Sequence, residues 1–433
     1  MTKKTTRGTG HKGTGVEERC DICGRPASML EYLIPGPVGN LCNECATSVH
    51  LAVEEVKNKQ KNFDQFALPS LEELPKPKEI VDYLNRYVIG QDEAKRTIAV
   101  AVYNHYKRLI YHSELKRDGS KDSSNIELDK SNIIMVGPTG TGKTLLARSI
   151  ARMLKVPFTI VDATVFTQAG YVGEDVESIL SRLYQAANYD VEATERGIVF
   201  VDELDKLSRK QDNPSITRDV GGEGVQQGLL KLLEGADVRI APEGGRKHPD
   251  QPLVKINTEN ILFIAGGAFD GIEKKIAKRL NTRMVGYTSD IRGKNVESGY
   301  DLLKYTSPAD LRDFGLIPEL IGRLPVLTYL QPLDREALRA ILTEPQNAIS
   351  KQYKKLLAMD GVDLRIDDAV YDFVVDKAIE YKVGARGLRS IFEDIMRDAM
   401  YELPSNEDRR AIRITRNYAE KHLRQTTLDQ ISA

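Results

Sequence analysis

Short apolar runs alternate with amphipathic stretches along the middle of the chain, and this pattern predicts an α/β fold. Residues 133–136 and 198–201 are continuous apolar runs, which is typical of strands buried on both faces of a parallel sheet. Residues 143–154 instead carry apolar side chains at helical spacing, among them Leu146 and Ile150. Because a buried strand followed by an amphipathic helix is the repeating unit of parallel sheets, we expect a large domain of this kind.

The pattern changes near Pro332, where we expect a smaller α+β domain to begin. Asp334 is placed to cap a helix, and further helical periodicity extends over 367–403. Residues 362–366 alternate between apolar and polar side chains, as in an edge strand, and 411–415 reads as a last strand.

A glycine-rich loop lies between the first predicted strand and the helix that follows it. It reads Gly137-Pro-Thr-Gly-Thr-Gly-Lys-Thr144 and fits G-x-x-x-x-G-K-[ST] at every position. Gly140 and Gly142 let backbone N–H groups turn toward a phosphate, and Lys143 supplies a cation for the β and γ phosphates. The alternative is a glycine-rich surface turn. The motif predicts a site for ATP and Mg²⁺ made by Gly137, Pro138, Thr139, Gly140, Thr141, Gly142, Lys143 and Thr144, whose hydroxyl suits the metal.

The apolar run at 198–201 ends in two acidic residues, Asp202 and Glu203. Alone, such a pair is as often a solvated strand end as a functional site. Downstream of a phosphate loop, the pair is typical of an ATPase, in which Asp202 holds Mg²⁺ with Thr144 and Glu203 activates the attacking water. We therefore predict that Asp202, Glu203, Lys143 and Thr144 form a catalytic centre.

Four cysteines near the amino terminus form two C-x-x-C pairs, Cys20 with Cys23 and Cys42 with Cys45. Eighteen residues separate the pairs, which is typical of a four-thiolate zinc site. Four thiolates leave no open coordination position, so the Zn²⁺ is expected to be structural. The alternative is free or redox-active cysteines. Because this segment lacks a dense basic face, we expect a protein-docking or self-associating module, with apolar residues Met29, Leu30, Tyr32, Leu33, Ile34 and Leu41.

The charge and composition of the chain disfavour nucleic acid and membranes as binding partners. The 433 residues include 62 Lys and Arg against 63 Asp and Glu, so a net charge of -1 gives no global attraction to nucleic acid or anionic lipid. No apolar run approaches the length of a membrane span, and we expect a soluble, cytoplasmic protein. The motifs G-x-S-x-G and H-E-x-x-H do not occur, so any peptide hydrolysis is expected to come from a partner.

Several longer motifs resemble those of the AAA+ protein unfoldases. They read Gly197-Ile-Val-Phe-Val-Asp-Glu-Leu-Asp-Lys206, Asn213-Pro-Ser-Ile-Thr-Arg-Asp219 and Gly222-Glu-Gly-Val-Gln-Gln227, and the likeness covers nearly the whole chain. The resemblance implies a homohexamer that uses ATP to unfold tagged proteins, some delivered by adaptors. It also implies translocation through an axial pore into a ClpP-type serine peptidase.

The same resemblance implies roles for individual residues. Arg323 matches the arginine finger that acts on a neighbouring subunit, and Arg386 matches the sensor-2 arginine that contacts the nucleotide from the small domain. Val88 and Ile89 are apolar enough to form a wall for the base. The residues implied at the pore are Tyr171 and Val172 in the first loop, the second loop at 208–219, and the basic Arg246, Lys247 and His248 at the entrance.

Two positions depart from the family pattern. The predicted strand at 261–265 runs into Gly266 and lacks the Asn or Thr that many AAA+ proteins carry there as a sensor. The loop expected to dock a peptidase usually carries an aliphatic-Gly-Phe tripeptide, and here reads Val285-Gly286-Tyr287. A tyrosine hydroxyl left unpaired in an apolar pocket would cost about 1–3 kcal/mol.

The sequence thus predicts an ATP-driven protein unfoldase. Two other functions are weighed against it: a remodelling chaperone that works without a peptidase, and a nucleic-acid translocase or clamp loader, which the near-neutral charge disfavours. The expected layout is a disordered start at 1–15, a zinc-binding domain at 16–56, a linker at 57–78, a large α/β ATPase domain at 79–328, a small α+β domain at 329–425 and a tail at 426–433.

Overall fold

The computed structural model covers two compact units, Met1–Gln65 and Phe66–Ala433, which are described separately. No helix in the described part of the chain is long and apolar enough to span a membrane. The structure describes residues 18–36, 39–51, 53, 66, 68–118, 126, 128–167, 174–208, 222–241, 253–284, 299–405 and 410–424.

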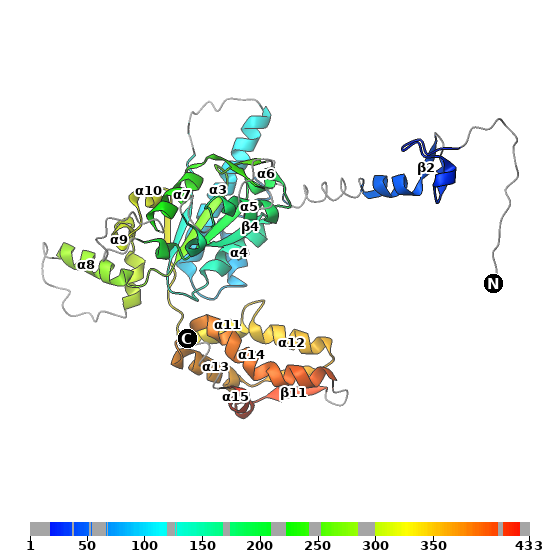
Figure 1. Cartoon of the computed structure of the whole chain (residues 1–433). Helices are drawn as coiled ribbons and strands as arrows, with labels where there is room; N and C mark the ends of the chain where they lie inside the picture. The colour runs from blue at the N-terminus through cyan, green and yellow to red at the C-terminus, as the bar shows by residue number, and fades with distance from the viewer. Residues whose placement is uncertain are drawn as a thin grey trace. The chain divides into compact units, whose positions relative to one another are not determined.

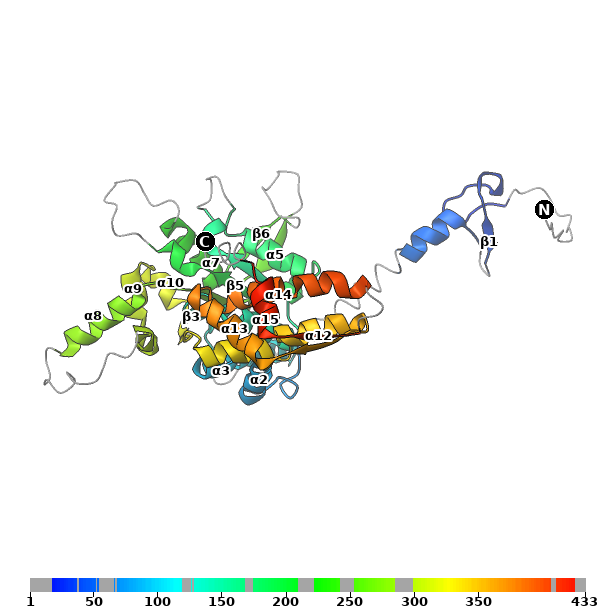
Figure 2. The ribbon, with the colours of Figure 1, turned by 90° about the horizontal axis from the view of Figure 1, so that it is seen from below.

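The larger unit is built around a five-stranded sheet in which every neighbouring pair is parallel. The two strands predicted from apolar runs, β3 (Ile133–Val136) and β5 (Ile198–Asp202), both lie in this sheet, so the expected parallel α/β domain is confirmed (the domain is seen in Figure 1, and the two strands are labelled in Figure 2). The strand order is β4 (Phe158–Asp162), β5 (Ile198–Asp202), β8 (Leu262–Gly267), β3 (Ile133–Val136) and β9 (Val326–Tyr329).

Both faces of the sheet are buried, and alternate residues of each strand contribute to two different cores. In β3, Ile133 and Met135 pack with one set of helices, whereas Ile134 and Val136 pack with another. This explains the unbroken apolar runs in the sequence, since all four residues of β3 and the four residues of β5 that precede Asp202 are buried. The first set is α2 (Pro77–Asn85), α3 (Asp92–Asp118) and α4 (Lys143–Leu154), and the second includes α5 (Ser178–Ala186), α7 (Glu223–Glu234), α8 (Ile272–Met284), α9 (Pro308–Phe314) and α10 (Pro318–Gly322).

Helix α3 differs from the sequence-based expectation. The polar composition of residues 112–130 predicts a surface loop, but the helix continues to Asp118. The segment between His112 and Asp118 contains Glu, Leu, Lys and Arg, which favour a helix even when they are polar. The polar composition was therefore a poor guide to where the helix ends.

The carboxyl-terminal part of the chain forms a separate helical core with a small parallel sheet. Asp334 accepts a hydrogen bond from the backbone N–H of Ala337 at 2.7 Å, so it caps α11 as predicted. The expected last strand is followed by a further helix, α15, which the sequence analysis missed. The elements are α11 (Arg335–Thr343), α12 (Ile349–Met359), β10 (Asp363–Ile366), α13 (Asp368–Glu380), α14 (Gly384–Glu402), β11 (Ala411–Ile414) and α15 (Arg416–His422), several of which are seen in Figure 2.

The chain passes from the large sheet to the small domain at Gln331. Leu330 still donates its N–H to the carbonyl of Val136 at 2.7 Å, which continues the pairing of β9 with β3. At the next residue, Gln331, the side chain of Gln91 replaces β3 as the hydrogen-bonding partner of the backbone. Its amide nitrogen donates to the carbonyl of Gln331 at 2.7 Å, and its amide oxygen accepts the N–H of Gln331 at 2.8 Å.

The smaller unit is a short β-hairpin followed by a helical segment. Strands β1 (Leu33–Pro35) and β2 (Asn40–Cys42) pair antiparallel, and residues 43–51 are helical. Cys20 and Cys42 are buried in this small module, whereas Met29, Tyr32 and Ile34 are exposed.

Candidate functional site

The glycine-rich loop joins the carboxyl end of β3 to the amino end of α4, the expected place for a ligand in a parallel sheet. A Cβ atom at Gly137 would lie 2.6 Å from the carbonyl oxygen of Leu330, so the loop requires glycine there. Gly142 has φ of +101°, a conformation that other residues rarely adopt, and α4 begins immediately after it. Its N-terminus therefore points its free N–H groups toward the loop, as an anion site requires.

The ammonium of Lys143 lies inside this loop. It is buried and donates to the carbonyl oxygens of Gly137 at 2.6 Å and Pro138 at 3.0 Å. Burial lowers the pKa of Lys143 below its usual value, while the carboxylates of Asp202 and Asp205 act in the opposite direction. The side chain thus places a buried amino group close to two carboxylates, which suits a group that binds phosphate together with a metal.

The predicted Mg²⁺ ligands are in contact. The hydroxyl of Thr144 donates to Asp202 Oδ2 at 3.1 Å, which joins the start of α4 to the end of β5. The backbone N–H of Glu203 donates to the other carboxylate oxygen of Asp202 at 3.0 Å. A hydroxyl and a carboxylate side by side are oxygen donors of the kind that Mg²⁺ prefers, so the residues present fit the metal.

A cavity of about 600 Å³ connects these groups. Its wall includes the whole loop from Thr139 to Thr144, the acids Asp202 and Glu203, and the predicted base wall of Val88 and Ile89. The small domain also contributes residues, from α11 and from the start of α14. Those residues are Ile341, Ala385 and Arg386, so the predicted sensor-2 position lies at the same cavity as the phosphate loop.

Arg323 lies elsewhere and is not among the residues that line this cavity. Its side chain is 54% exposed and forms an ion pair with Glu234 at 3.1 Å. It borders a second cavity of about 710 Å³, together with Arg108 and Lys130. The structure therefore brings Lys143, Asp202, Glu203 and Arg386 together and leaves Arg323 apart from them within one chain.

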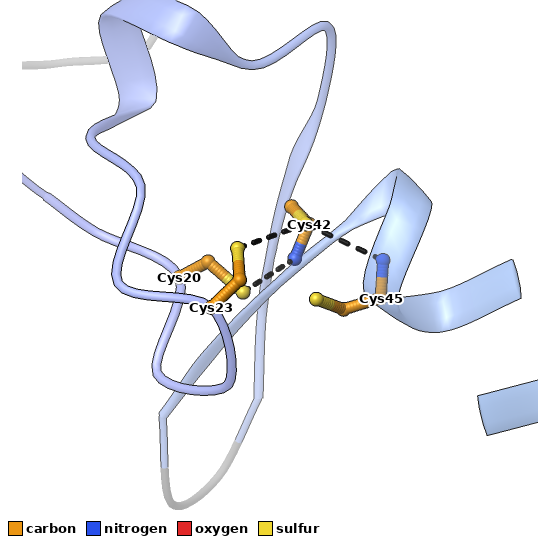
Figure 3. Close-up of side chains that lie close together, drawn as sticks. All are labelled: Cys20, Cys23, Cys42 and Cys45. Carbon is orange, nitrogen blue, oxygen red and sulfur yellow. Dashed lines mark hydrogen bonds between the residues drawn. The ribbon is translucent and has the colours of Figure 1, made fainter. Parts of the chain in front are cut away.

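The four cysteines of the smaller unit converge, as Figure 3 shows. Their sulfur atoms all lie within 4.8 Å of one another, and Sγ of Cys23 is 3.7 Å from Sγ of Cys42. A tetrahedron with Zn–S bonds of about 2.3 Å has edges of roughly 3.8 Å, whereas a disulfide needs about 2.05 Å. The spacing fits a zinc site and does not fit a disulfide.

Backbone N–H groups stabilise the thiolate form at one end of this cluster. The N–H of Cys42 donates to the sulfur of Cys20 at 3.3 Å, and the N–H of Cys23 is the main reason that the pKa of Cys20 falls to about 6. The pKa of Cys45 instead rises to about 12, chiefly through its contact with the side chain of Cys42. Hydrogen bonds from backbone N–H groups to sulfur are typical of the surroundings of metal-binding thiolates.

Two family profiles match the larger unit. The profile described as "AAA domain (Cdc48 subfamily)" matches residues 128–327, and the one described as "C-terminal, D2-small domain, of ClpB protein" matches residues 333–415. Among curated proteins, an "ATP-dependent Clp protease ATP-binding subunit ClpX" from Bacteroides fragilis is 59% identical over 415 residues, which cover 96% of this chain and 98% of the relative. The chain belongs to the ClpX family.

Other ClpX proteins match almost as well. One from Porphyromonas gingivalis is 58% identical over 94% of this chain and 96% of its own length. One from Bacteroides thetaiotaomicron is 57% identical over 96% of this chain and 98% of its own length. As a member of the ClpX family, the chain is an AAA+ Clp ATPase subunit that hydrolyses ATP.

The sequence analysis missed several residues at the nucleotide cavity of this ClpX-family chain. Asp205 is buried at the cavity wall, and its Oδ1 accepts the backbone N–H of Ala268 at 3.1 Å. Asp270 and Tyr87 line the same cavity. Asp205 lies two residues after Glu203, in Leu204-Asp205-Lys206, a local signal that could have pointed to it. Asp270 lies beyond the end of β8, where no sensor residue was recognised.

Four other sets of predicted residues of the ClpX type fall outside the described part of the chain. They are the first pore loop with Tyr171 and Val172, the second pore loop at 208–219 apart from Ser208, the basic Arg246, Lys247 and His248, and the docking tripeptide Val285, Gly286 and Tyr287.

Proposed function

We propose that this chain is the ATP-driven unfoldase and translocase of a two-component protease. Tagged or unfolded proteins, some delivered by adaptors, enter a hexameric ring in the cytoplasm and are threaded through its pore into a ClpP-type serine peptidase. The relatives are ATP-binding subunits of a Clp protease, and this supports the assignment.

The single observation that carries the proposal is that two domains share the walls of one nucleotide cavity. The phosphate loop and Glu203 belong to the large domain, whereas Arg386 and Ile341 belong to the small domain. A ligand that contacts both domains favours one angle between them, and hydrolysis removes that preference. The proposed work of the ring is this change in angle, which would move Tyr171 and Val172 along the pore.

The chemistry of the site follows from the positions of its side chains. Lys143 binds the β and γ phosphates, Thr144 and Asp202 would hold Mg²⁺, and Glu203 accepts a proton from the attacking water. The metal, when bound, neutralises charge that develops on the transferred phosphoryl group. Arg323 would complete this site on the next subunit, which agrees with its separation from the cavity of its own chain.

We further propose that the smaller unit is a zinc-stabilised docking module. Cys20, Cys23, Cys42 and Cys45 would hold the ion without an open position, so the metal would act on folding and not on catalysis. The proposed layout keeps the zinc-binding domain at 16–56, the linker at 57–78, the ATPase domain at 79–328 and the small domain at 329–425, with a start at 1–15 and a tail at 426–433.

A reconstituted degradation assay tests the proposal. The purified chain is mixed with a ClpP-type peptidase, ATP and a stable fluorescent protein that carries a degradation tag. We expect fluorescence to fall when all components are present and to persist without ATP or with a Glu203→Gln chain. If ATP is consumed while the fluorescent protein stays folded, the proposed unfolding activity is wrong.

The same assay separates a second candidate, a remodelling chaperone that works without a peptidase. Tyr287 favours this alternative, because its hydroxyl replaces the phenyl hydrogen expected in an apolar docking pocket. In that case the tagged protein loses fluorescence but is not cleaved. A Tyr287→Phe chain would then restore cleavage if the hydroxyl is what weakens docking.

A further inference from the structure

The side-chain amide of Gln226 is fully buried in α7, and both of its ends are hydrogen-bonded. Its nitrogen donates to the carbonyl of Leu207 at 2.7 Å, with a longer contact to the carbonyl of Gly315 at 3.4 Å. Its oxygen accepts the backbone N–H of Ile317 at 2.8 Å. A buried amide that loses such partners leaves unpaired polar groups, so the three segments are held in a fixed arrangement.

The segments joined by this amide carry the two halves of the proposed catalytic machinery. Leu207 ends the short 3₁₀ helix η3 (Leu204–Leu207), which begins directly after Glu203. Ile317 is the N-cap of α10, and Arg323 is the residue at which α10 ends. One side chain therefore connects the segment of the catalytic base to the segment of the arginine finger.

Helix α7 also contacts the far end of α10. Glu234, about 12 Å along the helix axis from Gln226, pairs with the guanidinium of Arg323 at 3.1 Å. The backbone carbonyl of Arg323 accepts the side-chain N–H of Asn132 at 2.9 Å. Because α10 is only one turn and a half long, these contacts at its two ends determine where it lies.

We propose that Gln226 is a positioning residue for the ATPase reaction. It holds α10, and with it Arg323, in a fixed relation to the segment that follows Glu203. Glu203, which acts within its own subunit, and Arg323, which acts on the neighbouring subunit, would then move together. This inference rests on the proposed action of Arg323 on the neighbouring subunit. Gln226 lines neither of the two cavities, so it acts on turnover and not on ATP binding.

Adjacent glutamines provide a matched pair for the test. Gln226→Met keeps the length of the buried side chain and removes its polar ends, whereas Gln227→Met changes the exposed neighbour on the same helix. In the full-length chain, we expect Gln226→Met to lower kcat by about 10- to 100-fold and leave KM for ATP within about twofold. The Gln227→Met chain is expected to match the wild type.

A double-mutant cycle distinguishes positioning from general loss of stability. If Gln226 acts through Arg323, Gln226→Met lowers kcat by less than about twofold in an Arg323→Ala chain. If the two substitutions lower kcat independently, so that their effects multiply in the double variant, the proposed role of Gln226 is wrong and the role of Arg323 is unaffected. An Arg323→Ala chain with wild-type kcat would instead overturn the role of Arg323 on which the inference rests.

A measurement on the wild-type chain gives an answer even if the methionine variant does not fold. Amide hydrogen exchange is followed with and without a non-hydrolysable ATP analogue. We expect protection of residues 204–208 and of residues 315–323 to rise together, because Gln226 bonds both segments. Protection that changes in one segment and not in the other would contradict a shared position.

Discussion

Glu203 has a backbone conformation that few residues of its type adopt. Its φ is +57°, in the left-handed region, where a non-glycine residue costs of order 1 kcal/mol or more. The turn ends β5 abruptly, so Asp202 completes the strand while Glu203 lines the nucleotide cavity. The two neighbouring carboxylates can therefore have different tasks, one with Thr144 and one with water.

Glu203→Gln should separate binding of ATP from its hydrolysis. The amide keeps the size of the side chain and cannot accept a proton from the attacking water. We expect kcat to fall by at least about 100-fold, with the affinity for ATP changed by less than about threefold. Steady-state ATPase and equilibrium nucleotide binding measure the two effects, and hydrolysis at the wild-type rate would contradict the assignment.

Lys130 gives a pH-dependent contribution to stability. Its ammonium donates to the carbonyl of Thr258 at 2.9 Å and lies 4.8 Å from the ring centre of Phe263, and burial lowers its pKa to about 7. Between that value and the unfolded pKa of about 10.4, the unfolded chain binds more protons, so stability rises with pH.

This contribution is expected to disappear in Lys130→Met. The free energy of unfolding of the methionine chain, relative to that of the wild type, should be highest near pH 7. The difference should fall toward about pH 9.5, by at most about 1.4 kcal/mol per pH unit. Melting temperatures of both chains across this range measure the difference. A difference that stays constant with pH would show that Lys130 does not titrate as described.

At the scale of elements, the parts of the site that are continuous in sequence were predictable. Strand β3, the phosphate loop and α4 follow one another, and their pattern identified Lys143 and Thr144. Glu203 was found for the same reason, since it follows β5 directly. Gln226 could not be found in this way, because its role depends on Leu207 and Ile317, which the sequence does not place beside it.

The contact that Gln91 makes at the junction between the domains was not visible in the sequence. Gln91 has φ of +63° and bonds both backbone groups of Gln331, the residue at which the chain leaves the large sheet. The same turn carries Val88 and Ile89 of the nucleotide cavity. A change at the base wall is therefore connected physically to the point about which the small domain would turn.

Gln91→Gly should test this junction without backbone strain, since glycine adopts positive φ readily. Loss of both hydrogen bonds is expected to change kcat and KM for ATP together, by about threefold or more, as hinge substitutions often do. Gln331→Ala is the control, because Gln91 binds its backbone and not its exposed side chain. Equal kinetics of the two variants would exclude a role for the Gln91 amide.

At the scale of the whole molecule, the chain combines a small four-cysteine module with an ATPase that has its own cores. The units Met1–Gln65 and Phe66–Ala433 are separate in their contacts. Among the described residues of the smaller unit, only Cys20 and Cys42 are buried, which is typical of a fold that depends on a metal.

Cys42→Ser is therefore expected to abolish zinc binding and unfold the smaller unit, while basal ATPase activity stays within about twofold. The zinc content per chain and limited proteolysis around residues 18–51 measure the first effect, and steady-state hydrolysis measures the second. A chain that loses its zinc together with its ATPase activity would show that the two units depend on each other.

The central claim is that each ATP site is completed by the neighbouring copy of the chain. Mixing Glu203→Gln chains with Arg323→Ala chains tests it most directly, because each variant keeps the group that the other lacks. If Arg323 acts across the interface, each variant alone hydrolyses ATP only at a low residual rate, and an equal mixture recovers hydrolysis at about a quarter of its sites. If Arg323 acts within its own chain, the mixture stays as inactive as its components.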